Sequence, residues 1–111
     1  MLQLTKASWR AQLERALRRD DPVSVNHRAA AFLASWFDVL FALNRQPHPG
    51  EKRLLHHAGT LCPLRPADTD ATVRRFLGLA AAMDPATMAE ADALLRDLDG
   101  LLRKAGLIPS P

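Results

Sequence analysis

The densest group of side chains that could do chemistry lies between positions 48 and 62. Histidine and cysteine are zinc ligands, but no pair in this group has the spacing of C-x-x-C or H-E-x-x-H. His56 and His57 are adjacent and therefore point about 100° apart on a helix. We predict no metal site and interpret most of the group as a solvated face. Its members are His48, Glu51, Lys52, Arg53, His56, His57 and Cys62.

The same segment could bind an anion. Its prolines stiffen a turn, and the sequence predicts a helix that begins at His48 or Pro49 with Glu51 in its first turn. The first amides of a helix lack partners within the helix and attract anions such as phosphate. Lys52 and Arg53 would add positive charge. The alternative is an ordinary corner, in which His48 helps to cap the helix.

Carboxylates with possible catalytic roles occur in three places. Asp38 lies in the most apolar part of the chain and is a possible buried carboxylate. It could be catalytic, pair with an arginine, or face a wet edge, because an unpaired buried charge is costly. Asp68 with Asp70, and Asp97 with Asp99, match the D-x-D that holds magnesium in nucleotidyl transfer. We interpret both pairs as structural, since residues two apart diverge on a helix.

No set of residues completes a catalytic machinery. The sequence contains no glycine-rich phosphate loop and no plausible Ser/His/Asp arrangement. We therefore predict no catalytic residue and no cofactor in this chain.

The elements that must position these residues are helices. Apolar residues recur at spacings of three and four, and nothing alternates with period two over a useful length. The pattern predicts helices at about 5–19, 22–44, 49–59, 69–83 and 85–105. Asp21 before Pro22 predicts a capped start for the second helix, and Gly59 predicts the end of the third.

The predicted fold is all-α, an antiparallel bundle of four or five helices. The helix over 22–44 is apolar around most of its circumference, which is typical of a central helix. The predicted core contains Trp9, Leu13, Leu17, Phe32, Leu33, Trp36, Leu40, Leu43, Leu55, Phe76, Leu77, Leu95, Leu98 and Leu102.

Composition limits the class of protein. A length of 111 residues predicts one domain over 1–111, and a net charge of +3 makes nucleic acid an unlikely partner. The most apolar stretch, 29–43, is shorter than the roughly 20 residues that span a bilayer. A single cysteine excludes an intrachain disulfide, and the first twenty residues carry charges throughout. We expect a cytoplasmic protein with no membrane partner.

Two segments carry a resemblance to a known family. Residues 36–45 read WFDVLFALNR and residues 48–54 read HPGEKRL. Together they resemble the C-terminal helical domain of bacterial nucleotidyltransferase-like proteins, which have an architecture similar to that of kanamycin nucleotidyltransferase. In such proteins an α/β domain carries a Gly-Ser motif and metal-binding aspartates, and the helical bundle closes over the acceptor substrate.

The resemblance implies an accessory, substrate-binding role without catalysis. Nucleotide and magnesium would bind only through a missing or separate catalytic domain, which would be the partner. Two alternatives remain open: a small module that binds protein, including a second copy of itself, and an RNA- or anion-binding protein. The candidate substrate- or anion-binding residues are Asn44, Arg45, His48, Lys52 and Arg53, and the resemblance adds Asp38 and Glu51 to the same surface.

Overall fold

The computed structural model describes residues 2–108, with side chains from Trp9 onward. Five helices follow one another: α1 (Leu2–Arg18), α2 (Pro22–Leu43), α3 (Leu54–Leu61), α4 (Thr69–Ala81) and α5 (Thr87–Lys104). No strand occurs within the described residues. The prediction of an all-α fold is confirmed.

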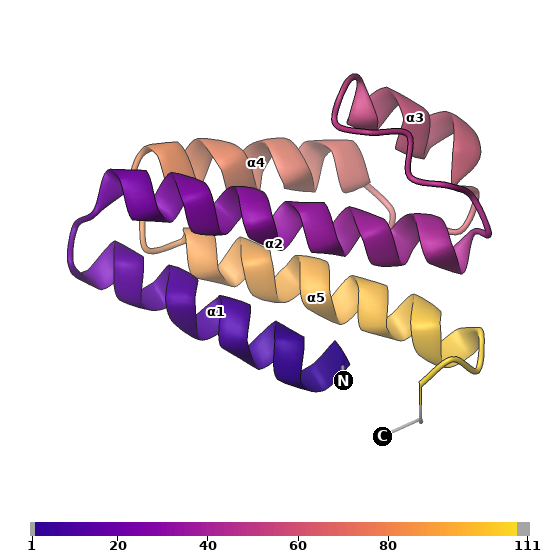
Figure 1. Ribbon diagram of the computed structural model, residues 1–111, viewed down its shortest axis with the longest axis horizontal. Helices are drawn as coiled ribbons and strands as arrows, with labels where there is room; N and C mark the ends of the chain where they lie inside the picture. Colours follow the sequence, from indigo (N-terminus) through magenta and orange to yellow (C-terminus); the bar gives the residue numbers. More distant parts are fainter. Residues whose placement is uncertain (1, 109–111) are drawn as a thin grey trace.

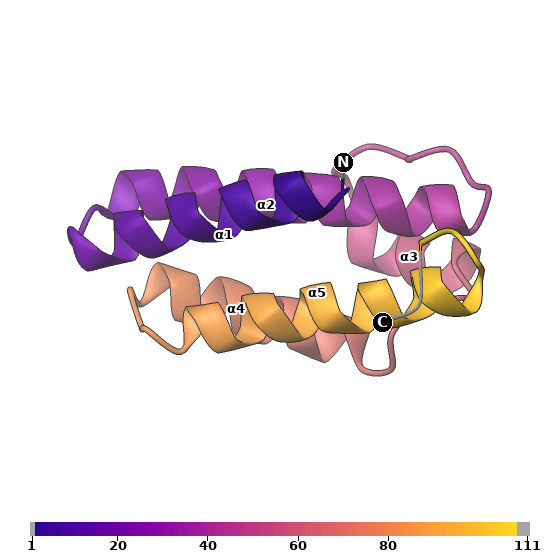
Figure 2. The ribbon, with the colours of Figure 1, turned by 90° about the horizontal axis from the view of Figure 1, so that it is seen from below.

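The four long helices form an antiparallel bundle, and α3 lies across one end of it (Figure 1). Figure 2 shows two layers, with α1 beside α2 in one and α4 beside α5 in the other. Contacts join α1 to α2, α2 to α4, α4 to α5 and α5 to α1, and α2 also reaches α5 across the centre. Helix α2 therefore contacts all three other long helices, as its apolar circumference predicts.

The core is built mainly on α2. Phe32 and Phe76 pack with ring centroids 5.4 Å apart, which joins α2 to α4. Trp36 is buried, and its indole Nε1–H donates to the Leu94 carbonyl of α5 at 2.9 Å. This bond satisfies the one polar group that a buried tryptophan brings into the core. Most predicted core residues are buried or pack against the buried cluster.

Leu77 is the exception, since 44% of its surface is exposed. The prediction that it belongs to the core is wrong. Its spacing on α4 points it toward α2, but no third element covers that side of the two helices. The reason is therefore tertiary: the helical pattern predicts a direction, and the packing decides whether anything lies there.

Four helices end in the same way, with a left-handed residue and a pair of closing hydrogen bonds. At the end of α2, the Arg45 N–H donates to Ala42 and the Gln46 N–H donates to Phe41, while Arg45 has φ 55°. This is the Schellman motif, in which glycine is the usual left-handed residue. Only α5 has a glycine there; the left-handed residues that close α1, α2, α4 and α5 are Asp20, Arg45, Met83 and Gly106.

The start of α2 confirms the predicted cap at Asp21, whereas the start of α4 has no side-chain cap. Asp21 accepts a hydrogen bond from the Ser24 backbone at 3.2 Å, and Pro22 occupies the first helical position. Asp68 precedes α4 in a left-handed conformation, but its side chain makes no capping bond. The neighbouring Thr69 hydroxyl instead donates to the Pro66 carbonyl.

The predicted bounds of the third helix are wrong. Residues 46–50 are irregular, and α3 begins only at Leu54. Gly50 has φ 92°, a conformation outside the helical region, and its N–H donates to His48 Nδ1 at 3.0 Å. Gly59 lies inside α3, which continues to Leu61. The helix stops there because Pro63 follows directly after its last cap residue.

Ion pairs fix the long helices against one another. Arg10 of α1 donates from Nε and Nη2 to the two carboxylate oxygens of Asp92 on α5, at 2.8 and 3.1 Å. Arg75 of α4 donates to Glu90 of α5 at 2.7 Å.

Among the described residues, no helix has the length and hydropathy that a membrane crossing requires.

Candidate functional site

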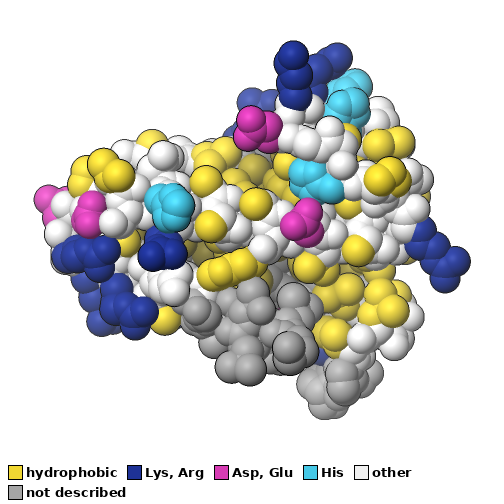
Figure 3. All heavy atoms as spheres, viewed as in Figure 1, with side chains coloured by type: hydrophobic (Ala, Val, Ile, Leu, Met, Phe, Trp, Pro, Cys, Tyr) yellow, Lys and Arg dark blue, Asp and Glu magenta, His cyan; other side chains and the backbone are white. Residues whose placement is uncertain are grey.

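A groove of about 530 Å³ opens where α2, α4, α3 and the segment before α3 meet. Figure 3 shows hydrophobic side chains exposed between these helices, with basic and histidine side chains beside them. The volume lies within the range of small-molecule sites, about 300–1,000 Å³. The groove is lined by Ala30, Leu33, Ala34, Phe37, His48, Glu51, Arg53, Leu54, Leu55, His56, Val73, Arg74 and Leu77.

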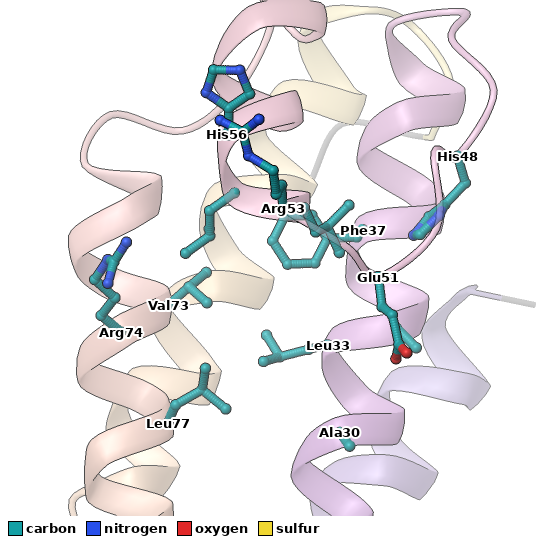
Figure 4. A pocket seen from close by; sticks show the side chains of 13 residues that line it. Ala30, Leu33, Phe37, His48, Glu51, Arg53, His56, Val73, Arg74 and Leu77 are labelled. Carbon is teal, nitrogen blue, oxygen red and sulfur yellow. The ribbon is translucent and has the colours of Figure 1, made fainter.

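Small residues on α2 create the hollow. Ala30 and Ala34 are four apart and exposed, and no neighbouring side chain fills the space above them. Leu33 and Phe37 lie on the same side of α2, at the spacing that places residues on one helical face. Figure 4 shows Leu33 pointing across the groove toward Leu77 of α4. The floor and both walls are therefore apolar.

The polar side chains lie at the rim. Arg53 and His56 both line the α3 end of the groove, and Arg74 points up from the α4 wall (Figure 4). Glu51 lies on the α2 side, and its carboxylate points away from Arg53. Arg74 is paired with Asp70 one turn earlier on α4. The arrangement is an apolar hollow with charged groups at its edges, which suits a ligand with an apolar body.

The left-handed backbone at Arg53 positions its side chain. Arg53 has φ 55° and ψ 36° and occupies the residue before α3, which no side chain caps. The first turn of α3 contributes Leu54, Leu55 and His56 to the groove. The uncapped, positive end of the α3 dipole therefore borders the same rim as the Arg53 guanidinium.

Only part of the predicted site reaches the groove. His48 and Arg53 line it, together with Glu51 from the wider surface that the resemblance indicated. Lys52 is exposed but does not line the groove, and Arg45 is the left-handed residue that closes α2. Within 44–53, some residues therefore line the rim of the groove, and others only shape the turn after α2.

Asn44 has a structural role. Its Nδ2 donates to the carbonyls of Leu40 at 2.9 Å and Leu64 at 2.8 Å, and its Oδ1 accepts from the Leu64 N–H at 2.9 Å. Both amide hydrogens and the amide oxygen are therefore engaged. Asn44 clamps the loop after α3 to the end of α2 and has no free donor for a ligand.

Asp38 is not a buried carboxylate. Its side chain is 67% exposed, and its Oδ1 lies 3.8 Å from His48 Nε2. The His48 ring also packs against Phe41, with ring centroids 5.5 Å apart. Of the three interpretations of Asp38 offered by the sequence, a position at a solvent-exposed edge is therefore correct. Asp38 and Phe41 hold the imidazole at the edge of the groove.

The aspartates of the two D-x-D pairs have different surroundings. Asp70 pairs with Arg74, and Asp97 is exposed while Asp99 is buried on α5. No group of three or more histidine, cysteine, aspartate or glutamate residues within positions 2–108 is arranged to hold a metal ion.

Cys62 is buried at the end of α3, and burial raises the pKa of its thiol, with Arg65 acting in the opposite direction.

The sequence prediction missed the residues that form the hollow. Ala30, Ala34 and Arg74 were not among the predicted site residues, and His56 was noted only as part of a solvated cluster. Small residues four apart on one face of a helix indicate either a close approach of a neighbouring element or a gap. The sequence alone does not distinguish these two outcomes, because they depend on what packs opposite.

Comparisons with protein-family models, curated proteins and solved structures found no match to this chain. The fold and the groove are therefore the basis for the functional proposal.

Proposed function

We propose that this chain is a non-catalytic helical binding module, and that the groove between α2 and α4 is its binding site. The observation that carries the proposal is the 530 Å³ apolar hollow, lined from four separate segments. Leu77 is exposed there although Val73, Phe76 and Ala80 on the same helix are buried. A ligand that covered this surface would gain roughly 25 cal/mol for each Å² of apolar area removed from water.

A more specific form of the proposal follows from the resemblance to nucleotidyltransferase-like proteins. The segments 36–45 and 48–54, which carry that resemblance, contribute Phe37, His48, Glu51, Arg53 and Leu54 to the groove. In this form the groove takes the apolar part of an acceptor substrate. Nucleotide, magnesium and the catalytic carboxylates belong to a separate catalytic domain, with which this chain assembles.

Filling the groove tests the general proposal. Ala34→Trp places a large side chain in the hollow, and Ala42→Trp is a matched control on an exposed face of the same helix, outside the groove. We would screen a set of small apolar molecules by ¹H–¹⁵N NMR on the labelled chain. Shifts at groove residues that disappear in Ala34→Trp and persist in Ala42→Trp support the proposal. Binding that maps elsewhere, or survives Ala34→Trp, contradicts it.

Co-purification tests the specific form. The tagged chain should recover a protein with a Gly-Ser motif and a D-x-D on a strand, and direct mixing of the two purified chains should give a stable complex. Purified chains that do not associate would leave the groove as a binding site and remove the nucleotidyltransferase assignment.

A further inference from the structure

We propose that the ligand of this groove is an apolar small molecule with one anionic group at one end, and that Arg53 binds that group. The inference rests on the proposed function, since it names the class of ligand for the same groove. A carboxylate and a phosphate monoester share the relevant chemistry, which is an anionic head on an apolar body.

The charge of the rim supports this assignment. Arg74 already pairs with Asp70, whereas Arg53 makes no ion pair with another described side chain. Arg53 is therefore the rim cation that is open to a ligand. A guanidinium can bind a carboxylate or phosphate through two parallel hydrogen bonds.

The end of α3 reinforces the same position. Arg53 precedes the first turn of α3, and no side chain caps that turn. The positive end of the helix dipole favours an anion at this place. His56, in the first turn of α3, also lines the groove and offers a further polar group to a ligand (Figure 4).

Glu51 sets the direction of the ligand. It also lines the groove, but its carboxylate points away from Arg53 along the α2 side (Figure 4). An anionic head is repelled from that side and attracted to the α3 end. The apolar body then lies over Leu33, Val73 and Leu77, which form the hollow between α2 and α4.

Three probes of equal chain length separate charge from hydrophobicity: octanoate, octan-1-ol and octylamine. Each is titrated into the ¹⁵N-labelled chain at pH 7 and followed by NMR shifts. We expect octanoate to bind in the groove most tightly and octylamine most weakly. Octyl phosphate is the fourth probe, and its affinity relative to octanoate tells which anionic head the rim prefers.

Two variants test whether Arg53 binds the anionic group of the ligand. Arg53→Gln should weaken octanoate about tenfold, as expected for loss of a charge-assisted hydrogen bond, and should leave octan-1-ol unchanged. Lys52→Gln is the matched control, because it removes one charge from the adjacent exposed residue, outside the groove. It should leave the affinities of both probes unchanged. Unchanged octan-1-ol binding also shows that Arg53→Gln retains the fold.

Other results would overturn the inference, and they differ from the results that would contradict the proposed function. If all probes bind the groove with equal affinity, or Arg53→Gln and Lys52→Gln weaken octanoate equally, the anionic assignment is wrong while the groove remains a binding site. If octylamine binds most tightly, Glu51 rather than Arg53 sets the ligand charge. If no probe shifts a groove residue, the assignment of an apolar ligand with one anionic group is wrong. Failure of the proposed function itself is read from the separate screen with Ala34→Trp.

Discussion

The Asn44 side chain and the Leu64 backbone bind each other through two hydrogen bonds, one in each direction. Asn44 Nδ2 donates to the Leu64 carbonyl, and the Leu64 N–H donates to Asn44 Oδ1. Leu64 is 20 residues away and lies in the loop that follows α3. This pair fixes the position of α3 at the end of α2, and with it one edge of the groove.

Asn44→Ala removes this clamp. We expect a loss of about 1–2 kcal/mol in the free energy of unfolding, the amount typical of a few partly exposed hydrogen bonds. The amides of α3 should also exchange with solvent faster, because the loop is no longer held to α2. Urea unfolding and hydrogen exchange measure the two effects. Asn26→Ala, at an exposed position of α2, is the control and should change neither.

Trp36→Ala should destabilise the protein by roughly 3–5 kcal/mol, because it opens a cavity where α2 meets α5. Trp36→Phe keeps most of the ring volume but removes the indole N–H that donates to the Leu94 carbonyl, so we expect a smaller loss of about 1–3 kcal/mol. Chemical unfolding followed by far-UV circular dichroism measures both variants. A nearly neutral Trp36→Ala would contradict the central position of α2.

Met83→Gly should stabilise the protein. Met83 closes α4 with φ 58°, a left-handed conformation that costs a side chain about 1 kcal/mol and glycine little. We expect a gain of about 0.5–1 kcal/mol, reduced in part by the greater freedom of glycine in the unfolded chain. Arg45→Gly, at the end of α2, should act in the same direction. Gly106→Ala, at the corresponding position after α5, should do the opposite in the same unfolding assay.

Cys62 should make the stability fall at alkaline pH. Burial raises the pKa of this thiol in the folded chain, so the folded chain keeps its proton where the unfolded chain has lost it. The contribution of the Cys62 thiol to stability is therefore complete below the ordinary thiol pKa of about 8.5. This contribution is lost as the pH rises above that value toward the higher pKa of the folded chain. The chain has no tyrosine to titrate in this range. Unfolding between pH 7 and 9.5 should show a shallower decline in Cys62→Ala.

Cys62 should also resist chemical modification. The side chain is buried, so an aromatic disulfide reagent should react with the folded chain far more slowly than with the urea-unfolded chain. Rapid labelling of the folded chain at neutral pH would show that the end of α3 opens readily. It would also place the loop clamped by Asn44 among the least stable parts of the fold.

Much of the fold was predictable because its causes are local. The spacing of apolar residues along 22–44 involves neighbours three and four apart, and it predicts both the helix and its central position. The Asp21 cap acts on an amide three residues away, so the dipeptide with Pro22 is sufficient to locate the start of α2. The absence of a period-two pattern likewise predicted an all-α chain.

The third helix shows where local prediction fails. Pro49 suits a first helical position, and the sequence alone favours a helix from there. In the structure Gly50 instead has a positive φ and a hydrogen bond to His48, and α3 begins only at Leu54. Glycine permits both conformations, and only the complete turn selects one.

The groove was decided by tertiary structure. Ala30 and Ala34 create a hollow only because α4 lies beside α2 without filling the space above them, and Leu77 is exposed for the same reason. Asn44 belongs to the corner rather than the site because Leu64 returns to it from 20 positions along the chain. The sequence by itself determined which segments are helices and which sides are apolar, since both depend on near neighbours. Which of those sides meet, and which remain open to a ligand, depends on contacts between distant residues and was determined only by the packing of the bundle.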